Sequence, residues 1–398
     1  MFSRTSASAF RRLLVLTVLH FSSMAVLLLC GRWIRQMGGS ESELGWFSAS
    51  IVPGIIIGAP LAGRLAGRLG ERRLILAGLI AVGTMTLGFA AFTQISWWLV
   101  PMRFLQGIGH GMVFTGLLSL TAHSIPDQRK AQGMGYFALC AQLGNMTGIA
   151  LAENLLAPHG FAAVFCGGAV LAGLAFLGAL TLPTFADGLP TAASNGSQGL
   201  NPTTGQIALT VAFFFVLGGS YGSVLQVLPL LVQDIARISG EIGRVTPVMA
   251  TIFLTVAVAR LFLARVADGR FRQPALIGSL LLLALASASW PLASSTDELI
   301  PIAAAFALGY GLLFPGLNGL VLTQVAGPWR ARASGWIVMA FDGGFFGLLL
   351  ALGPVAEHYG YRVMFPLLGL LQLASATLFL VMLRRLQRLR RAAGAKDL

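Results

Sequence analysis

Residues 109–117 read GHGMVFTGL, and residues 309–317, which lie 200 positions later, read GYGLLFPGL. Two further pairs of segments agree at nearly the same offset: GRLAGRLGERR from Gly63 with ARVADGRFR from Ala264, and KAQG from Lys130 with RASG from Arg332. Self-similarity at a fixed spacing is the mark of an internal repeat. The chain is therefore predicted to consist of two related halves.

A polar segment lies between the halves. Residues 183–205 read PTFADGLPTAASNGSQGLNPTTG and contain a single charged residue, Asp187. A segment of this composition is flexible and cannot form a packed core. We therefore expect an N-terminal six-helix bundle over 1–182, a cytoplasmic linker over 183–205, and a C-terminal six-helix bundle over 206–398 that ends in a basic tail.

The composition indicates which class of protein the halves form. Hydrophobic residues make up 56% of the 398 residues and charged residues only 10%, whereas soluble domains carry about 25% charged residues. A soluble core cannot bury this much apolar surface, so we expect an all-α polytopic membrane protein. The net charge of +13 alone would suggest a nucleic-acid partner. The basic tail has no interleaved aromatic residues, and we expect no nucleic-acid binding.

A helix that crosses a bilayer needs about 20 mostly apolar residues. The apolar runs predict twelve such spans, six on each side of the linker. They lie near 13–31, 44–63, 74–93, 98–122, 131–156, 161–182, 206–231, 244–264, 275–293, 299–325, 334–355 and 363–383. No small-residue cleavage site follows the first run, so we interpret it as a retained span rather than a signal peptide.

The distribution of Lys and Arg predicts the orientation. With both termini in the cytoplasm, the cytoplasmic segments carry 20 of the 27 basic residues and the outer loops carry five, while Arg103 and Arg260 fall within spans. We therefore expect a multi-pass protein of the inner (cytoplasmic) membrane with both termini cytoplasmic. Attraction to anionic lipid accounts for the basic tail.

The loop after the second span resembles a known signature. Its residues are similar to Gly-x-x-x-Asp-Arg-x-Gly-Arg-Arg, which is the signature of the major facilitator superfamily of secondary transporters. Gly63, Arg68, Gly70 and Arg72 match, Gly67 is in place of the Asp, Glu71 is in place of the first Arg of the final pair, and Arg73 follows directly. The copy in the second half keeps the acid as Asp268. The resemblance implies two pseudo-symmetric six-helix bundles with the substrate site between them, near the membrane midplane.

Two shorter motifs resemble patterns of particular branches of that superfamily. Arg103-Phe-Leu-Gln-Gly107 is similar to the Arg-x-x-Gln-Gly pattern of proton-coupled members. Gly144-Asn-Met-Thr-Gly148 resembles the exporter motif Gly-Pro-x-x-Gly, with Asn145 in place of Pro. Together they imply a proton antiporter similar to the drug, sugar and siderophore efflux branch.

Ionisable residues inside spans are candidates for function, because a charge at the bilayer centre costs roughly 3 kcal/mol on insertion scales. A carboxylate in an apolar wall can take up and release a proton as its exposure to water alternates. Helical spacing places Arg103 and His110 on one face of their span, where they can bias that protonation. The proton-coupling candidates are Asp342, Glu153, Arg103 and His110. The alternative for Asp342 is a structural hydrogen bond, for Glu153 a position at the outer interface, and for His110 a packing role.

Other polar and aromatic residues are candidates for the substrate cavity. They are His20, Gln106, Gln142, Asn145, Tyr221, Tyr310 and Asn318. For the amides, the alternative is hydrogen bonding between helices. The candidates for a cytoplasmic gate are Gly63, Arg68, Arg72, Arg73, Arg265 and Asp268. For these basic loops, the alternative is that they only set the orientation of the protein.

The sequence favours a proton-coupled exporter of a small organic molecule that works by alternating access. The alternative is a proton-coupled importer of a sugar, carboxylate or amino-acid-like nutrient. An importer of organic anions should place two or more arginines in the cavity, and Arg103 is the main candidate. No motif for an enzyme, metal site or cofactor is present. We expect a monomer whose partners are its substrate, protons and the lipid bilayer.

Overall fold

The computed structural model describes residues 4–125, 130–182, 203–240, 242–262, 272–324 and 327–392, and the regular elements within those ranges are helices. The first half contains α1 (Arg4–Ala25), η1 (Val26–Leu29), α2 (Cys30–Gln36), α3 (Glu41–Ala49), α4 (Val52–Leu69), α5 (Glu71–Gly88), η2 (Phe89–Ala91), α6 (Leu99–His123) and α7 (Lys130–Ala179). The second half contains α8 (Thr204–Ser239), α9 (Thr246–Phe262), α11 (Arg272–Ser289), η4 (Trp290–Leu292), α12 (Thr296–Gln324), α13 (Gly327–Gly347), α14 (Leu349–Tyr359) and α15 (Tyr361–Ala392).

Nine helices in the described ranges are long and apolar enough to cross a membrane. One of them, Gln132–Ala179, has 48 residues and makes two passes that meet at Gly160, where φ is +73°. With α6 and the shorter α9, the arrangement is consistent with the twelve spans that the sequence predicts. The protein is thus an all-helical, multi-pass membrane protein.

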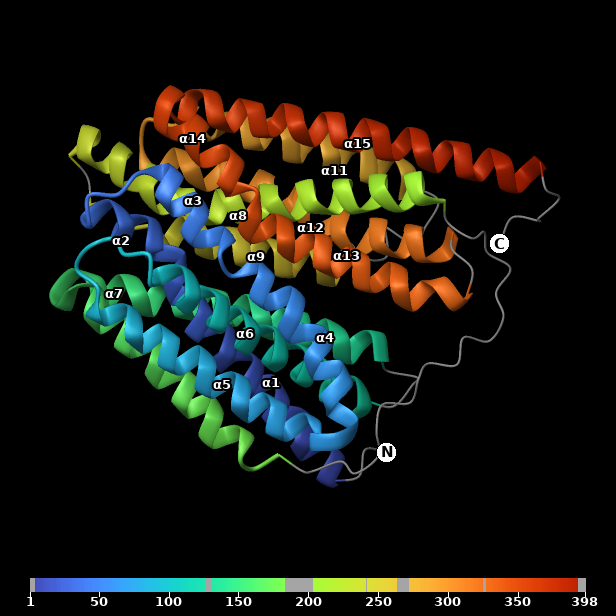
Figure 1. Cartoon of the computed structure of the whole chain (residues 1–398). Coiled ribbons are helices and arrows are strands. Elements are labelled where there is room, and N and C mark those ends of the chain that lie inside the picture. The colour runs from blue at the N-terminus through green and yellow to red at the C-terminus, as the bar shows by residue number, and fades with distance from the viewer. Residues whose placement is uncertain are drawn as a thin grey trace.

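The helices form two bundles, coloured blue to green and yellow to red in Figure 1. In the first bundle α1 packs on α7, and α6 packs on α4 and α5. In the second bundle α8 packs on α13, and α12 packs on α9 and α11. Equivalent helices therefore make equivalent contacts, as the sequence repeat predicts. The linker, apart from 203–205, lies outside the described residues.

Glycines set the closest helix contacts in both bundles. A Cβ atom at Gly148 of α7 would collide with the backbone oxygen of Ser22 in α1. In the second bundle, a Cβ atom at Gly222 of α8 would collide with the backbone oxygen of Phe345 in α13. Small residues allow membrane helices to approach this closely. These contacts fix α7 and α13, whose side chains form much of the site described below.

Helix α1 begins and α15 ends at the same end of the molecule, which we call the terminal end; the opposite end, with α2 and α14, is the distal end (Figure 1). At the distal end α3 packs on α14, and α7 packs on α9. The two bundles lie close together there and diverge toward the terminal end (Figure 1). A capping box formed by Ser40 and Glu43 opens α3.

Candidate functional site

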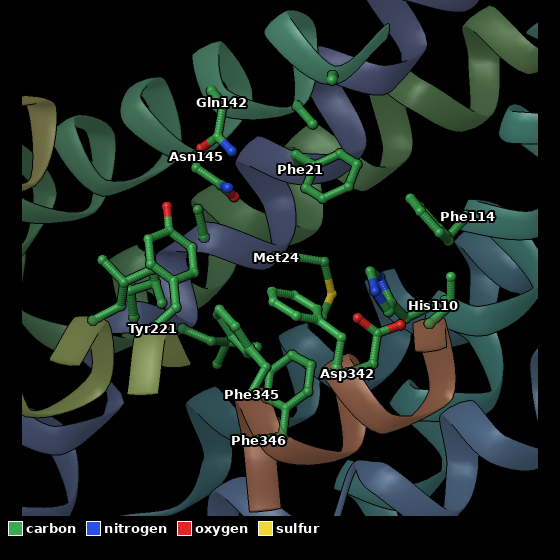
Figure 2. Close-up of a pocket in the computed structure, with 18 of the residues that line it drawn as sticks. Phe21, Met24, His110, Phe114, Gln142, Asn145, Tyr221, Asp342, Phe345 and Phe346 are labelled. Carbon is green, nitrogen blue, oxygen red and sulfur yellow. The ribbon is translucent and has the colours of Figure 1, made fainter. Parts of the chain in front are cut away.

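A cavity of about 390 Å³ lies between the two bundles. Its wall is mainly apolar and aromatic, and Figure 2 shows Phe21, Met24, Phe114, Phe345 and Phe346 around it. Polar side chains from both bundles interrupt this apolar wall. They are Arg103, His110, Gln142, Asn145, Tyr221, Gln226, Arg260, Tyr310 and Asp342. The structure therefore brings most of the predicted proton and substrate candidates to one place.

Asp342 lies on α13 and lines the cavity (Figure 2). It is the only carboxylate among the described lining residues. No ion pair or hydrogen bond to Asp342 is formed within the described part of the chain. Close packing of Gly344 against the backbone of Phe215 in α8 holds this segment of α13 in place. Asp342 is thus an isolated acid in an apolar wall, where the sequence predicts it.

Arg103 enters the cavity wall from α6 and is 2% exposed. Its Nη1 atom donates a hydrogen bond of 2.6 Å to Oε1 of Gln106. The Nε2 atom of Gln106 donates in turn to Oγ1 of Thr86, at 2.8 Å. The guanidinium lies 4.8 Å from the centroid of the Phe47 ring, a typical cation–π geometry. Gln106 therefore orients Arg103 from behind and does not itself line the cavity.

His110 lines the cavity and pairs with His20 of α1. The His110 Nδ1 and His20 Nε2 atoms are 3.0 Å apart, and the two rings are stacked. His20 is fully buried behind His110, and its Nδ1 has no hydrogen-bond partner within the part of the chain that the structure describes. One of the two facing nitrogens must carry a hydrogen and the other must accept it. His20, which the sequence suggests for the cavity, is therefore a partner of the cavity residue.

Two tyrosines and an arginine form the wall on the side of the second bundle. The rings of Tyr221 and Tyr310 are parallel and 4.0 Å apart between centroids. The guanidinium of Arg260 lies 5.8 Å from the centroid of the Tyr310 ring. Arg260 is on α9 and lines the same cavity as Arg103. The sequence gives Arg103 as the main candidate for a cavity arginine, and the structure adds Arg260 to the residues that line the cavity.

Gln142 and Asn145 line the cavity from α7 (Figure 2). Gln142 is 8% exposed, and no described residue forms a hydrogen bond with its Oε1 atom. Asn145 takes the position of the Pro in the exporter motif. Asn318 lies in α12, and its side chain is outside those described.

Glu153, the second predicted proton carrier, lies at the distal end and not in the described wall of the cavity. Its carboxylate accepts hydrogen bonds from the backbone N–H groups of Val245 and Thr246, at 2.7 and 2.8 Å. Arg32 contacts the same carboxylate at 3.5 Å. Because Val245 and Thr246 precede and begin α9, Glu153 links the two bundles.

A second group of side chains joins the bundles at the distal end. It consists of Arg35, Glu41, Asp234 and Tyr361, which we call the distal polar cluster. The Nη1 atom of Arg35 donates to Asp234 at 2.6 Å, and its Nη2 atom donates to Glu41 at 3.0 Å. The Tyr361 hydroxyl donates to Glu41 at 2.9 Å. Sequence reasoning missed this cluster, since its only signal is basic and acidic residues in separate outer loops.

The predicted gate residues of the first half lie at the terminal end. Gly63, Arg68 and Arg73 are exposed, and Arg72 donates a hydrogen bond to the backbone oxygen of Leu180 in its own half. Within the described ranges, no ion pair or hydrogen bond links these arginines to the second bundle. Arg265 and Asp268 lie outside the described residues. The gate thus remains a prediction.

Comparisons with known proteins agree with this architecture. The chain is 29% identical to the multidrug resistance protein MdtG of Salmonella arizonae over 152 residues, a match that spans 37% of this chain and 37% of MdtG. Its fold is similar to that of the nucleoside transporter NupG, with a TM-score of 0.76, 14% identity and coverage of 94% of this chain and 98% of NupG.

The human organic anion transporter MFSD10 (TETRAN) is also similar in fold, with a TM-score of 0.68, 16% identity and coverage of 95% of this chain and 100% of that chain. At these identities the likeness to solved structures concerns the fold alone. The sequence profile of the Major Facilitator Superfamily matches residues 13–348, which include both the repeat and the cavity. The chain therefore belongs to the Major Facilitator Superfamily.

Proposed function

We propose that this protein is a proton-coupled secondary transporter that moves a small organic molecule across the inner membrane by alternating access. The observation that carries the proposal is the isolated carboxylate of Asp342 in a cavity that both bundles line. An ionisable group is costly inside a membrane protein and is normally retained for function. Membership of a transporter superfamily supports the same conclusion.

The conformation fits one state of an alternating-access cycle. Ion pairs and hydrogen bonds join the bundles at the distal end. The described lining residues extend to Leu118 and Met134, which lie in the terminal parts of α6 and α7. The excess of basic residues at the terminal end favours a cytoplasmic location for it. On this assignment the cavity faces the cytoplasm and is closed to the outside.

Asp342 is proposed as the proton carrier. The charged carboxylate is disfavoured among the phenylalanines of α13, and a bound proton removes that cost. When the bundles rock, the same carboxylate meets water from the other side and releases its proton. His110, paired with His20, is a second titratable group on the wall. Coupling then requires that substrate and proton affect each other's binding in the cavity.

Export is the direction that we propose first. The largely apolar and aromatic wall suits an amphipathic molecule, and the similarity to MdtG, named a multidrug resistance protein, supports export. In inside-out vesicles, an imposed pH gradient should drive uptake of drug-like compounds by the wild type but not by Asp342→Asn. Asp297→Asn removes an exposed acid at the start of α12 and is the matched control. The proposal fails if no compound moves with the gradient.

Import is the second candidate direction, and one observation favours it. Two arginines, Arg103 and Arg260, line the cavity, as expected for an importer of an organic anion. Import with protons predicts that adding substrate to whole cells makes the external medium more alkaline. Export by exchange predicts no such effect, so the sign of the pH change separates the two directions.

A further inference from the structure

We propose that the cavity binds an organic anion, with its anionic group at Arg260 and its flat apolar part against the aromatic side chains of the wall. The inference rests on the proposed function only in taking this cavity as the transport site. It concerns the charge of the ligand, which neither the family nor the fold determines.

The first argument is the charge of the cavity wall. Arg103 and Arg260 line the cavity, and Asp342 is the only carboxylate among the described lining residues. Neither arginine forms an ion pair with a described residue. Buried charges in proteins are normally paired. A ligand with a negative charge would supply the missing partner.

The second argument is the surplus of hydrogen-bond donors. The Nε atoms of Arg103 and Arg260 and the hydroxyl of Tyr221 are buried and have no hydrogen-bond partner among the described residues. Each of these groups can donate a hydrogen bond, and buried donors in native proteins are nearly always satisfied. All three belong to residues of the cavity wall. The cavity is therefore prepared for a ligand with strong acceptor atoms, such as a carboxylate.

The third argument is the surface next to Arg260. The rings of Tyr221 and Tyr310 are stacked on each other, and the ring of Phe345, 6.0 Å from Tyr221, is tilted to them; all three residues line the cavity. The Arg260 guanidinium lies 5.8 Å from the centroid of the Tyr310 ring. A ring system can pack against this aromatic part of the wall while its carboxylate reaches the guanidinium fork. An aryl carboxylate has this combination of groups.

The placement of Asp342 links ligand charge to proton binding. An ionised Asp342 repels an anion in the same cavity, and a protonated Asp342 does not. The titratable and charged groups of the described wall are Arg103, His110, Tyr221, Arg260, Tyr310 and Asp342. Binding of a proton to Asp342 therefore strengthens binding of the anion, and the reverse. Such coupling favours co-transport of proton and anion, which corresponds to import, the second candidate direction.

The test uses three probes with one ring system and different charges: 2-naphthoate, 2-naphthamide and 2-naphthamidine. Binding to the purified full-length protein is measured by calorimetry and by the shift in thermal unfolding, without a proton gradient. We expect naphthoate to bind at least about tenfold more tightly than the amide or the amidine, since hydrogen bonds to charged groups are the strong ones.

Variants assign the effect to Arg260. Arg260→Gln should weaken naphthoate binding about tenfold and leave the binding of the amide unchanged. Arg260→Lys keeps the charge without the fork and should give an intermediate affinity. Arg237→Gln removes an exposed arginine near the end of α8 and should change nothing. Thermal unfolding without probe checks that each variant is folded.

Several results would overturn the inference. The first is that naphthoate binds no more tightly than the amide, or that neither binds measurably. The second is that the amidine binds most tightly. The third is that Arg260→Gln and Arg237→Gln lose the same amount of naphthoate affinity. If Arg260→Gln does not fold, the relative affinities of the wild type for the three probes and the naphthoate affinity of Arg260→Lys still test the inference. Preferential naphthoate binding without any proton-driven flux would leave the inference standing and refute the proposed coupling.

Discussion

Glu153 of α7 and Thr246 of α9 join the two bundles: the Oε2 atom of Glu153 accepts a hydrogen bond of 2.8 Å from the backbone N–H of Thr246. The Oε1 atom of the same carboxylate accepts from Val245 at 2.7 Å. Backbone N–H groups at a helix start lack partners within the helix and carry a partial positive charge. The carboxylate therefore stabilises the start of α9, and the contact holds the distal end closed.

Removing this link should open the distal end. Glu153→Ala deletes two hydrogen bonds to a charged acceptor, each worth about 1.5–3 kcal/mol, and should raise the open fraction about tenfold or more. The measurement is labelling of a cysteine at Leu225, a buried cavity residue, with an impermeant maleimide from the distal side. The native cysteines Cys30, Cys140 and Cys166 are first replaced.

Glu298→Ala is the matched control for this experiment. Glu298 accepts a hydrogen bond only from nearby Ser294 among the described residues, so labelling should stay at the wild-type level. Unchanged labelling in Glu153→Ala together with loss of proton coupling would contradict the linking role. That result would instead support Glu153 as a proton carrier, the role that the sequence suggests.

The Arg35–Asp234 pair allows a charge-reversal test. Its atoms are 2.6 Å apart and come from different bundles. Arg35→Asp should raise distal labelling, and adding Asp234→Arg should lower it again. Residues in direct contact typically couple by about 0.5–3 kcal/mol in a double-mutant cycle. The double variant should not return fully to the low labelling of the wild type, because Arg35 also contacts Glu41 and Tyr361. Strictly additive effects of the two substitutions would rule out the pair as part of the closure.

The histidine pair should contribute to stability. His20→Phe keeps a ring in the buried site but removes the partner of the His110 Nδ1 atom. A buried polar group without its partner costs about 1–3 kcal/mol, so the melting temperature should fall. His159→Phe changes an exposed histidine and should leave the melting temperature nearly constant. Equal melting temperatures for the two variants would show that the His20–His110 hydrogen bond adds nothing.

Glycine substitutions test the packing of α8 on α13. Gly222→Ala places a methyl group against the backbone of Phe345, and overpacking of this kind costs about 1–3 kcal/mol. At Gly278 of α11 no other group lies within 4 Å of an added Cβ. Gly278→Ala should therefore be neutral or stabilise the helix by up to about 1 kcal/mol. Thermal unfolding of both variants checks the prediction, which an equally stable Gly222→Ala protein would contradict.

Sequence reasoning goes far for the fold and for part of the site. The repeat and the apolar runs are local patterns, so they indicate two related helical halves without knowledge of contacts. Polar residues inside spans must avoid lipid, which is why Asp342, His110 and Gln142 are on the cavity wall. The same argument does not distinguish a residue on the wall from one just behind it, such as Gln106 or His20.

What the sequence leaves open depends on contacts between distant segments. Arg35 and Asp234 are 199 positions apart, and no local pattern pairs them. The inward direction of Arg260 depends on how α9 packs against α12. Glu153 is near the end of a pass, where depth along the helix does not tell a cavity residue from a bundle contact. Each of these is a property of the assembled bundles.

The measurement that tests the central claim most directly is proton-driven transport by Asp342→Asn in proteoliposomes. A pH gradient is imposed, and movement of the three naphthalene probes and of drug-like compounds is followed. The wild type should move at least one compound with the gradient. Asp342→Asn should lose this movement and still exchange labelled for unlabelled compound at equal pH. Gradient-driven transport by Asp342→Asn at the wild-type rate would contradict the proposal that Asp342 carries the proton.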